Sequence, residues 1–183
     1  AASDVYKRQD MGCELGAKGM LFVGHIGKLV KLGAGIMNTH SKMADGRMEI
    51  LAACAVRAGA GIEAVRNILD CVTTDAALEL LKNEKILGKT MEQLMLRIDA
   101  CLQKRGGDNM QIGAVVFSNE YGLLGKTEQA DELLLKITAD VSSEKYRVIF
   151  NKADLLDPEA GQNYWVAQDL SLIHISEPTR LDV

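Results

Sequence analysis

The sequence predicts an α/β fold in which a short, mostly parallel sheet packs against several helices. Two short, mainly apolar runs, residues 19–24 and 110–117, are typical of strands that are buried on both faces. Several segments with helical periodicity separate them, so the order is strand, helices, strand, helix, which favours a layered α/β architecture. The 183 residues are 48% hydrophobic and 25% charged, which suits one domain, or a part of one, with a sizeable core.

The first strand leads into a glycine turn and then a helix. Residues 24–32 turn on two glycines and then take up a helix-compatible pattern of leucine, valine and lysine. Such a unit directs backbone N–H groups and a positive helix end at one place, which suits an anionic group or a cofactor. Residues 33–41 are rich in glycine and then in small polar side chains, and predict a loop or broken helix in which Thr39 or Ser41 caps the next helix.

Three amphipathic segments predict the helices that follow. Apolar residues between positions 42 and 57 fall close to one helical face, and Gly59 and Gly61 end that helix. Thr73 or Thr74 caps the third, short helix. The second helix carries an apolar stripe formed by Ile62, Val65, Ile68, Leu69 and Val72.

The cleanest helix signal is a capping box at residues 90–93, in which Thr90 and Gln93 can satisfy each other's backbone donors. A last capped helix starts at Thr127 and runs through Ile137, and residues 146–150 predict a further strand. The helix that follows the capping box has an apolar stripe formed by Met91, Leu94, Met95, Ile98 and Leu102.

Charge and composition argue against several function classes. The net charge is −4, from 21 basic and 25 acidic residues, and no aromatic residue occurs between Phe22 and Phe117, so nucleic acid is not an expected partner. The sequence lacks both an apolar run of roughly 18 residues and a signal peptide, so no membrane association and a cytoplasmic location are expected. The four cysteines form no CxxC pair, and His25 and His40 have no further ligand cluster, so no metal site is predicted.

The two ends of the sequence differ from its middle. Residues 1–9 and 171–180 resemble translated sequencing-adapter DNA, and the alternative is a native, frayed terminus. We therefore interpret residues 1–9 and 170–183 as artefactual or disordered tails and leave them out of the fold. Because the sequence has no initiator methionine, we expect a chain that is truncated on both sides.

Four stretches carry a resemblance to a known family: residues 23–41, 44–47, 72–77 and 114–125. They are similar, in the same order, to the C-terminal half of the cobalt-precorrin-5B C(1)-methyltransferases, the CbiD family, and the resemblance covers about residues 10–138. It implies the C-terminal part of a larger enzyme that transfers a methyl group from S-adenosylmethionine to C-1 of cobalt-precorrin-5B, which gives cobalt-precorrin-6A in anaerobic cobalamin biosynthesis. Because about half of such an enzyme is missing, we expect the chain alone to be inactive.

Methyl transfer to an electron-rich carbon depends on positioning and needs no nucleophilic side chain, so no catalytic residue is assigned. A tight strand–helix connection, histidines satisfied by nearby backbone, helix capping and a solvated lysine face explain the candidate residues equally without a ligand. The candidates for substrate or cofactor binding flank the glycine turn and are Gly24, His25, Gly27, Lys28, Asn38, Thr39, His40 and Ser41. The cationic side chains nearest to a corrinoid's carboxylate arms would be Lys28, Lys31, Lys42 and Arg47.

Two acidic residues near these motifs are weaker candidates. Asp45 lies about twenty residues after the glycine turn, where a Rossmann unit places a ribose-binding acid, but it falls in a helical pattern. Asp75 follows two threonines at a predicted helix start, so a favourable interaction with the helix dipole is the preferred interpretation.

Residues 139–169 form an extension whose origin the resemblance does not explain. Residues 151–154, Asn-Lys-Ala-Asp, follow an apolar run and resemble the motif with which GTPases bind guanine. A GTPase also needs a phosphate-binding loop, and His25 stands where its lysine should be. The alternatives to the methyltransferase are therefore a GTP-binding fragment and an inactive chimeric reading frame, and the oligomeric state is left open.

Overall fold

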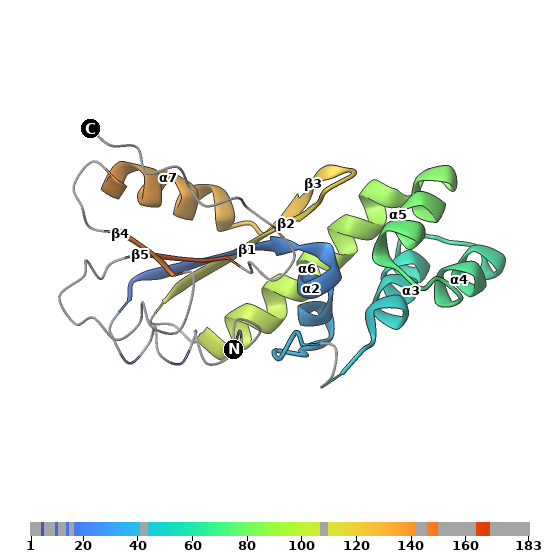
Figure 1. Cartoon of the computed structure of the whole chain (residues 1–183), viewed down its shortest axis with the longest axis horizontal. Coiled ribbons are helices and arrows are strands. Elements are labelled where there is room, and N and C mark those ends of the chain that lie inside the picture. The colour runs from blue at the N-terminus through green and yellow to red at the C-terminus, as the bar shows by residue number, and fades with distance from the viewer. Residues whose placement is uncertain are drawn as a thin grey trace.

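The computed structural model describes Val5, Asp10, Glu14 and residues 17–40, 44–106, 110–141, 146–149 and 164–168. These residues form a five-stranded sheet in the order β3-β2-β1-β5-β4 (Figure 1). The central strand, β1, pairs in parallel with β2 and β5, β4 pairs in parallel with β5, and only the edge strand β3 is antiparallel. The predicted α/β fold with a mostly parallel sheet is thus confirmed. The strands are β1 (Gly19–His25), β2 (Gln111–Ser118), β3 (Gly122–Lys126), β4 (Tyr146–Ile149) and β5 (Tyr164–Gln168).

The helices cover both faces of this sheet. Helix α7 lies on one face, against β1, β2, β4 and β5, and α6 lies on the other, against β2 and β3 (Figure 1). Helices α3, α4 and α5 pack on one another, and α3 and α5 also contact α6. The helices are α2 (Ile26–Leu29), the 3-10 helix η1 (Val30–Ala34), α3 (Arg47–Arg57), α4 (Ile62–Leu69), α5 (Thr74–Asn83), α6 (Leu87–Gly106) and α7 (Ala130–Val141). None of these described helices has both the length and the apolar character needed to cross a bilayer.

Strand β1 is buried on both faces, as predicted. Met20 and Phe22 belong to the larger hydrophobic core, while Leu21 joins a smaller core with Leu133 and Ile137 of α7. This alternation follows from the two-residue period of a strand, which sends successive side chains to opposite faces. The larger core contains every residue of the stripe predicted on α6: Met91, Leu94, Met95, Ile98 and Leu102.

Three helix starts differ from the prediction. Helix α3 begins at Arg47 with Gly46 as its N-cap, and Thr39 does not cap it, while Ser41 lies outside the described residues. Helix α6 begins at Leu87, so the predicted capping box is wrong. The Thr90 hydroxyl donates to the Ile86 carbonyl oxygen at 2.9 Å, which satisfies it within the helix instead of at the helix start.

The third difference involves Thr127, which bonds to the sheet. Its backbone N–H donates to the Ala114 carbonyl at 2.9 Å, and its hydroxyl accepts from the Ala114 N–H at 2.9 Å. Helix α7 therefore begins at Ala130, not at Thr127. The sequence also gave no sign of β3, which pairs with β2 through an irregular register between Val116 and Phe117, or of β5.

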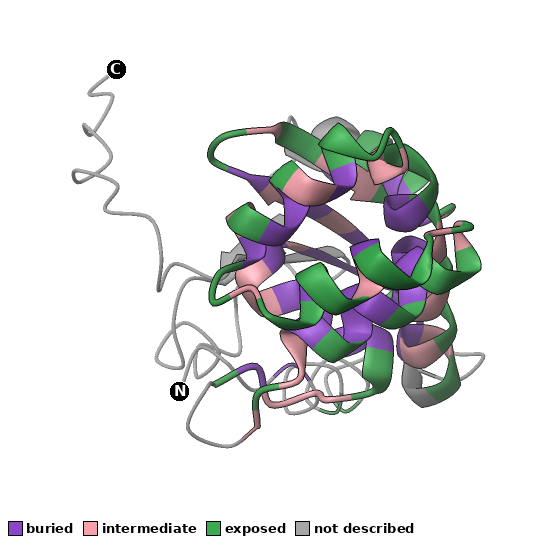
Figure 2. Cartoon of the chain, turned by 90° about the vertical axis from the view of Figure 1, so that its right-hand side faces the viewer, coloured by how far each residue is buried: buried purple, intermediate pink, exposed green. Residues whose placement is uncertain are grey.

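Helix α4 shows the limit of periodicity as a measure of burial. Ile62, Leu69 and Val72 of the predicted stripe are exposed, by 70%, 46% and 85%, whereas Ile68 is buried. Figure 2 shows this end of the molecule, where buried residues face inward and exposed ones outward on the packed helices. The predicted end of α3 is confirmed, because Gly59 adopts a φ of 94° that other residues rarely take.

Candidate functional site

A cleft of about 320 Å³ lies at the carboxyl end of the central strand β1. In open α/β sheets, ligands bind at this edge, beyond the carboxyl ends of parallel strands. The cleft is built from segments far apart in the sequence: the turn after β1, η1 and the loop after it, the start of α3, and the start of α5. The lining residues are His25, Gly27, Lys28, Lys31, Thr39, Arg47, Thr73, Thr74 and Asp75.

His25 ends β1 and holds the turn in place. Its Nδ1 accepts a hydrogen bond from the Gly27 backbone N–H at 3.1 Å, which caps the short helix α2. Because Nδ1 accepts, the proton of the neutral imidazole is on Nε2. The ring also packs edge-to-face on Phe117 near the end of β2, with 5.9 Å between the ring centroids. The ends of β1 and β2 therefore meet at the cleft.

The two glycines of the turn have different roles. Gly24 lies within β1, and a Cβ there would be 2.9 Å from Cγ of Leu29, so the glycine lets the helix pack closely on the strand. Gly24 does not line the cleft, which favours the tight strand–helix connection over ligand binding at this position. Gly27 does line the cleft, but its N–H is already bonded to His25.

Lys31 is buried beneath the cleft, with 1% of its surface exposed. Its Nζ donates to the carbonyl oxygens of Thr39 at 3.2 Å and Ala44 at 2.7 Å. Burial lowers the pKa of this lysine below its usual value, because the charged form loses its hydration. Lys31 thus joins the backbone at Thr39 to that at Ala44, and we interpret it as a residue that positions the wall of the cleft.

Arg47 and Asp45 form a two-point ion pair at the start of α3. Arg47 Nε and Nη2 each donate to a different carboxylate oxygen of Asp45, both at 2.8 Å. These hydrogen bonds lower the pKa of Asp45 to about 2. Asp45 is thereby engaged with Arg47, and it does not line the cleft, so the arrangement gives no support to its reading as a ribose-binding acid.

The start of α5 forms the wall opposite the turn. Thr73 caps this helix by accepting a hydrogen bond from the Ala76 N–H at 3.2 Å, as predicted. A Cβ on Gly27 would lie 3.6 Å from the Thr74 hydroxyl oxygen, so the two walls are close together. Oδ1 of Asp75 is buried and has no hydrogen-bond partner among the described residues.

The structure gathers half of the predicted site residues. His25, Gly27, Lys28 and Thr39 line the cleft. Asn38 and His40 do not line it; instead, Asn38 Oδ1 accepts from the His40 N–H at 3.1 Å, in a local bond that caps no helix. Ser41 and Lys42 lie outside the described residues. Within the described part of the chain, no group of three or more histidine, cysteine, aspartate or glutamate side chains could hold a metal ion.

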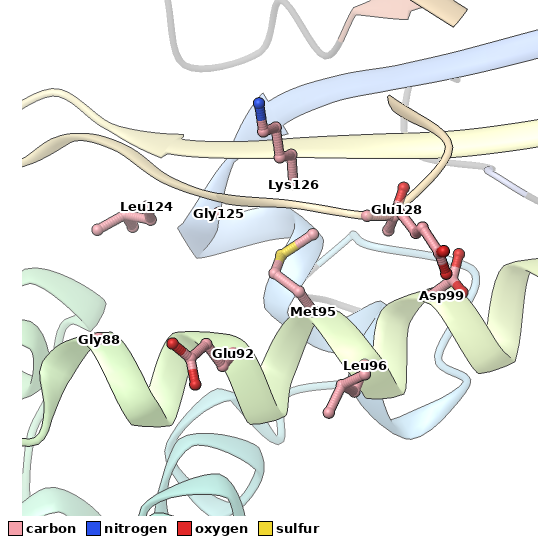
Figure 3. A pocket seen from close by; sticks show the side chains of 10 residues that line it. Gly88, Glu92, Met95, Leu96, Asp99, Leu124, Gly125, Lys126 and Glu128 are labelled. Atoms are coloured by element: carbon pink, nitrogen blue, oxygen red, sulfur yellow. The ribbon is translucent and has the colours of Figure 1, made fainter. Parts of the chain in front are cut away.

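A second, larger cavity of about 550 Å³ lies between α6 and β3 (Figure 3). Glu92 and Asp99 of α6 and Glu128 give it acidic walls. Lys126 points away from α6 in Figure 3, and it bonds to Asp131 at 2.6 Å. None of the binding-site residues predicted from the sequence lines this cavity, and its charge is unsuited to the carboxylate arms of a corrinoid.

Comparisons with known proteins match this chain to one group of enzymes. The family described as "CbiD, C-terminal domain" matches residues 38–128. A cobalt-precorrin-5B C(1)-methyltransferase of Alkaliphilus metalliredigens is 43% identical over 116 residues, which are 63% of this chain and 30% of the relative. Enzymes of the same name from Clostridioides difficile and Gloeobacter violaceus are 38% and 40% identical over 66% of this chain, and cover 30% and 35% of the relatives. The chain thus spans about a third of the length of these relatives, and no solved structure matches it.

Proposed function

Because this chain belongs to the CbiD family, whose C-terminal domain it carries at residues 38–128, we propose that it is part of an enzyme that methylates C-1 of cobalt-precorrin-5B. The relatives' name supplies both the reaction and the substrate. We propose S-adenosylmethionine as the methyl donor and cobalt-precorrin-6A as the product. When bound, this donor supplies an electrophilic methyl group on a positively charged sulfur.

One observation links the cleft to this function. Three of the stretches that resemble the family, residues 23–41, 44–47 and 72–77, each contribute side chains to the same cleft. The fourth, residues 114–125, reaches its edge through the contact of Phe117 with His25. These stretches are separated by up to about ninety residues in the sequence, so a shared ligand site accounts for their convergence better than local structure does.

The cleft fits a positioning role. Its volume of about 320 Å³ is at the lower end of ligand-binding pockets, so it can hold a part of either ligand. The buried Lys31 and the paired Arg47 give it walls that are fixed before a ligand arrives. Such pre-organisation is what methyl transfer requires, since holding the reacting atoms in line accounts for most of the catalysis.

A domain exchange tests the proposal. Residues 38–128 would replace the matched segment in the Alkaliphilus metalliredigens relative, and the chimera would be expressed in a strain that lacks this enzyme and needs cobalamin to grow. We expect growth from the chimera, loss of growth with Arg47→Met in the cleft, and retained growth with Arg57→Met at the exposed end of the same helix. A soluble, folded chimera that does not restore growth would contradict the proposal.

Nothing in the comparisons favours the GTP-binding alternative. The Asn-Lys-Ala-Asp motif at 151–154 lies outside the described residues. A direct test is to titrate the chain with GTP and with S-adenosylmethionine in parallel. Binding of GTP alone would revive the alternative.

A further inference from the structure

The two ligands of the proposed reaction make different demands on a binding site. The carboxylate arms of a corrinoid are ionised at neutral pH and can only accept hydrogen bonds. S-adenosylmethionine has a single carboxylate and also carries an ammonium group, a sulfonium and ribose hydroxyls, which are positively charged or donate hydrogen bonds. The chemistry of the cleft walls therefore indicates which of the two ligands the cleft receives.

Two of the cations near the cleft are already engaged within the protein. The Lys31 Nζ donates to two backbone carbonyl oxygens, at 3.2 and 2.7 Å. The Arg47 guanidinium makes two hydrogen bonds of 2.8 Å to Asp45. Binding a carboxylate arm through either side chain would require these interactions to break, and the buried carbonyl oxygen that Lys31 leaves would lose its donor.

The wall formed by α5 instead contains an acceptor that lacks a hydrogen-bond donor. Asp75 lines the cleft, and its buried Oδ1 has no partner among the described residues. A desolvated carboxylate oxygen without a donor is unfavourable, and a ligand that donates to the carboxylate would relieve this. The terminal torsion of aspartate is soft, so the carboxylate can turn toward a donor in the cleft.

The surroundings of Asp75 are negative as well. Desolvation, together with the charges of Glu120, Glu79 and Asp75, raises the pKa of the nearby Tyr121. Three carboxylates thus act on one side chain at the edge of this wall. Lys28, Lys31 and Arg47 also line the cleft, so these carboxylates favour a cationic or hydrogen-bond-donating group only at the α5 wall.

Resting on the proposed function, we infer that this cleft is the subsite of the methyl donor and that Asp75 binds it, by accepting hydrogen bonds from its ammonium group or ribose hydroxyls. The carboxylate arms of the corrinoid then bind outside this cleft. The inference reverses the expectation from the sequence, which assigned the cations of this region to the carboxylate arms and Asp75 to the helix dipole.

The test measures binding to the full 183-residue chain by calorimetry. The probes are S-adenosylhomocysteine, methylthioadenosine, which lacks the amino-acid group, and cobyrinic acid, a corrinoid with free carboxylate arms. We expect Asp75→Asn to weaken the binding of S-adenosylhomocysteine by about tenfold or more, and to leave the binding of cobyrinic acid unchanged. A comparable loss of affinity for methylthioadenosine identifies the ribose as the group that Asp75 binds. A loss of affinity for S-adenosylhomocysteine alone identifies the ammonium group.

Two further variants control for structural effects. Glu79→Gln removes an exposed carboxylate from the same helix and should change S-adenosylhomocysteine affinity by less than about twofold. Asp75→Glu keeps the charge and should retain more affinity than Asp75→Asn, and thermal melting establishes that each variant is folded. If Asp75→Asn does not fold, the inference is tested by comparing Asp75→Glu with Glu79→Gln. Only Asp75→Glu should alter the affinity for S-adenosylhomocysteine.

Three results would overturn the inference. They are no binding of S-adenosylhomocysteine to the chain, an equal effect of Asp75→Asn and Glu79→Gln, and tighter binding of cobyrinic acid to Asp75→Asn without loss of S-adenosylhomocysteine. The last would place a carboxylate arm in the cleft and leave the proposed function intact. Failure of the domain exchange, by contrast, would count against the proposed function whatever the calorimetry shows.

Discussion

Replacing Lys31 by methionine tests whether a buried amine holds the wall of the cleft. Methionine has a similar length and suits a buried position, but it cannot donate a hydrogen bond. The change therefore removes the bonds to the carbonyl oxygens of Thr39, at 3.2 Å, and Ala44, at 2.7 Å, with little change in packing. We expect Lys31→Met to lower the stability of the fold and to loosen the backbone at Thr39 and Ala44.

The size of the loss follows from the burial of the two acceptors. An acceptor left without a donor in the interior costs about 1–3 kcal/mol. The bond to Thr39 is buried and that to Ala44 is partly buried, so the carbonyl oxygen of Ala44 can regain water more easily. Removing a desolvated ammonium group returns part of the cost, so we expect a net loss of about 2 kcal/mol.

Urea unfolding followed by circular dichroism measures this loss, with Lys89→Met as the matched control. Lys89 is an exposed lysine on α6, so the same substitution there should change stability by less than about 0.5 kcal/mol. Equal losses for the two variants would refute the positioning role of Lys31.

The pH dependence of stability is a second test of the role of Lys31. Burial lowers the pKa of Lys31, so between that lowered value and 10.5 the unfolded chain binds more protons than the folded one. Stability then rises with pH in this range. The wild-type protein should therefore gain stability relative to Lys31→Met as the pH is raised from neutral toward 10.5. A constant difference between the two proteins would show that the amine is not desolvated.

Three further substitutions have defined outcomes. Asp45→Asn should cost about 0.5–1 kcal/mol at neutral pH, because Asp45 is half exposed. Because Arg47 lowers its folded pKa to about 2, the wild type should lose this advantage as the pH falls from about 4 to about 2, as followed by urea unfolding. Gly59→Ala should cost about 1–2 kcal/mol in thermal unfolding, because φ is 94° there. Thr73→Ala should cost about 1 kcal/mol by removing the cap of α5, and Thr73→Ser should not.

Each of these predictions has a result that contradicts it. A stability gap between wild type and Asp45→Asn that persists at pH 2 would mean that the ion pair does not set the pKa. Gly61→Ala is the control for Gly59→Ala, because Gly61 has a φ of −69° and open space around it, so equal losses would exclude backbone strain. A loss for Thr73→Ser as large as that for Thr73→Ala would show that the hydroxyl group does not provide the stability.

The strands β1, β2 and β4 were predictable because their patterns are local. Apolar runs without helical periodicity, between glycines or polar residues, are explained by few structures other than buried strands. Strand β3 left no such pattern, since its residues are exposed or only partly buried and three of its five are glycine or lysine. Its place at the edge of the sheet is a consequence of pairing with β2, which is not encoded within its own five residues.

Helix starts were less predictable because threonine satisfies several roles. Thr73 caps α5, Thr90 bonds within α6, and Thr127 bonds to β2. A threonine before an apolar helical pattern fits all three, and only the surrounding structure decides which backbone groups need a partner. For the same reason, the stripe on α4 indicated a helix correctly but not its burial.

The site was predictable where it is local and was missed where it depends on the fold. The glycine turn and the loop after it are continuous in sequence, and they supply His25, Gly27, Lys28 and Thr39 to the cleft. The start of α5, which supplies the opposite wall, lies more than thirty residues further along the chain. Its threonines and Asp75 have a complete local explanation as a helix start, so nothing in the sequence required them to have a second role.

The glycine turn itself shows how one side chain changes the chemistry of a familiar unit. A strand, glycine turn and helix usually present free backbone N–H groups, which predicts an anion site. Here, Nδ1 of His25 already accepts from the Gly27 N–H at 3.1 Å, so that N–H is not available to an anionic ligand. The turn therefore contributes side chains instead of this backbone donor, and Asp75, whose buried Oδ1 has no partner among the described residues, lines the same cleft. These two features together favour a ligand that donates hydrogen bonds, where the glycine pattern alone would have favoured one that accepts them.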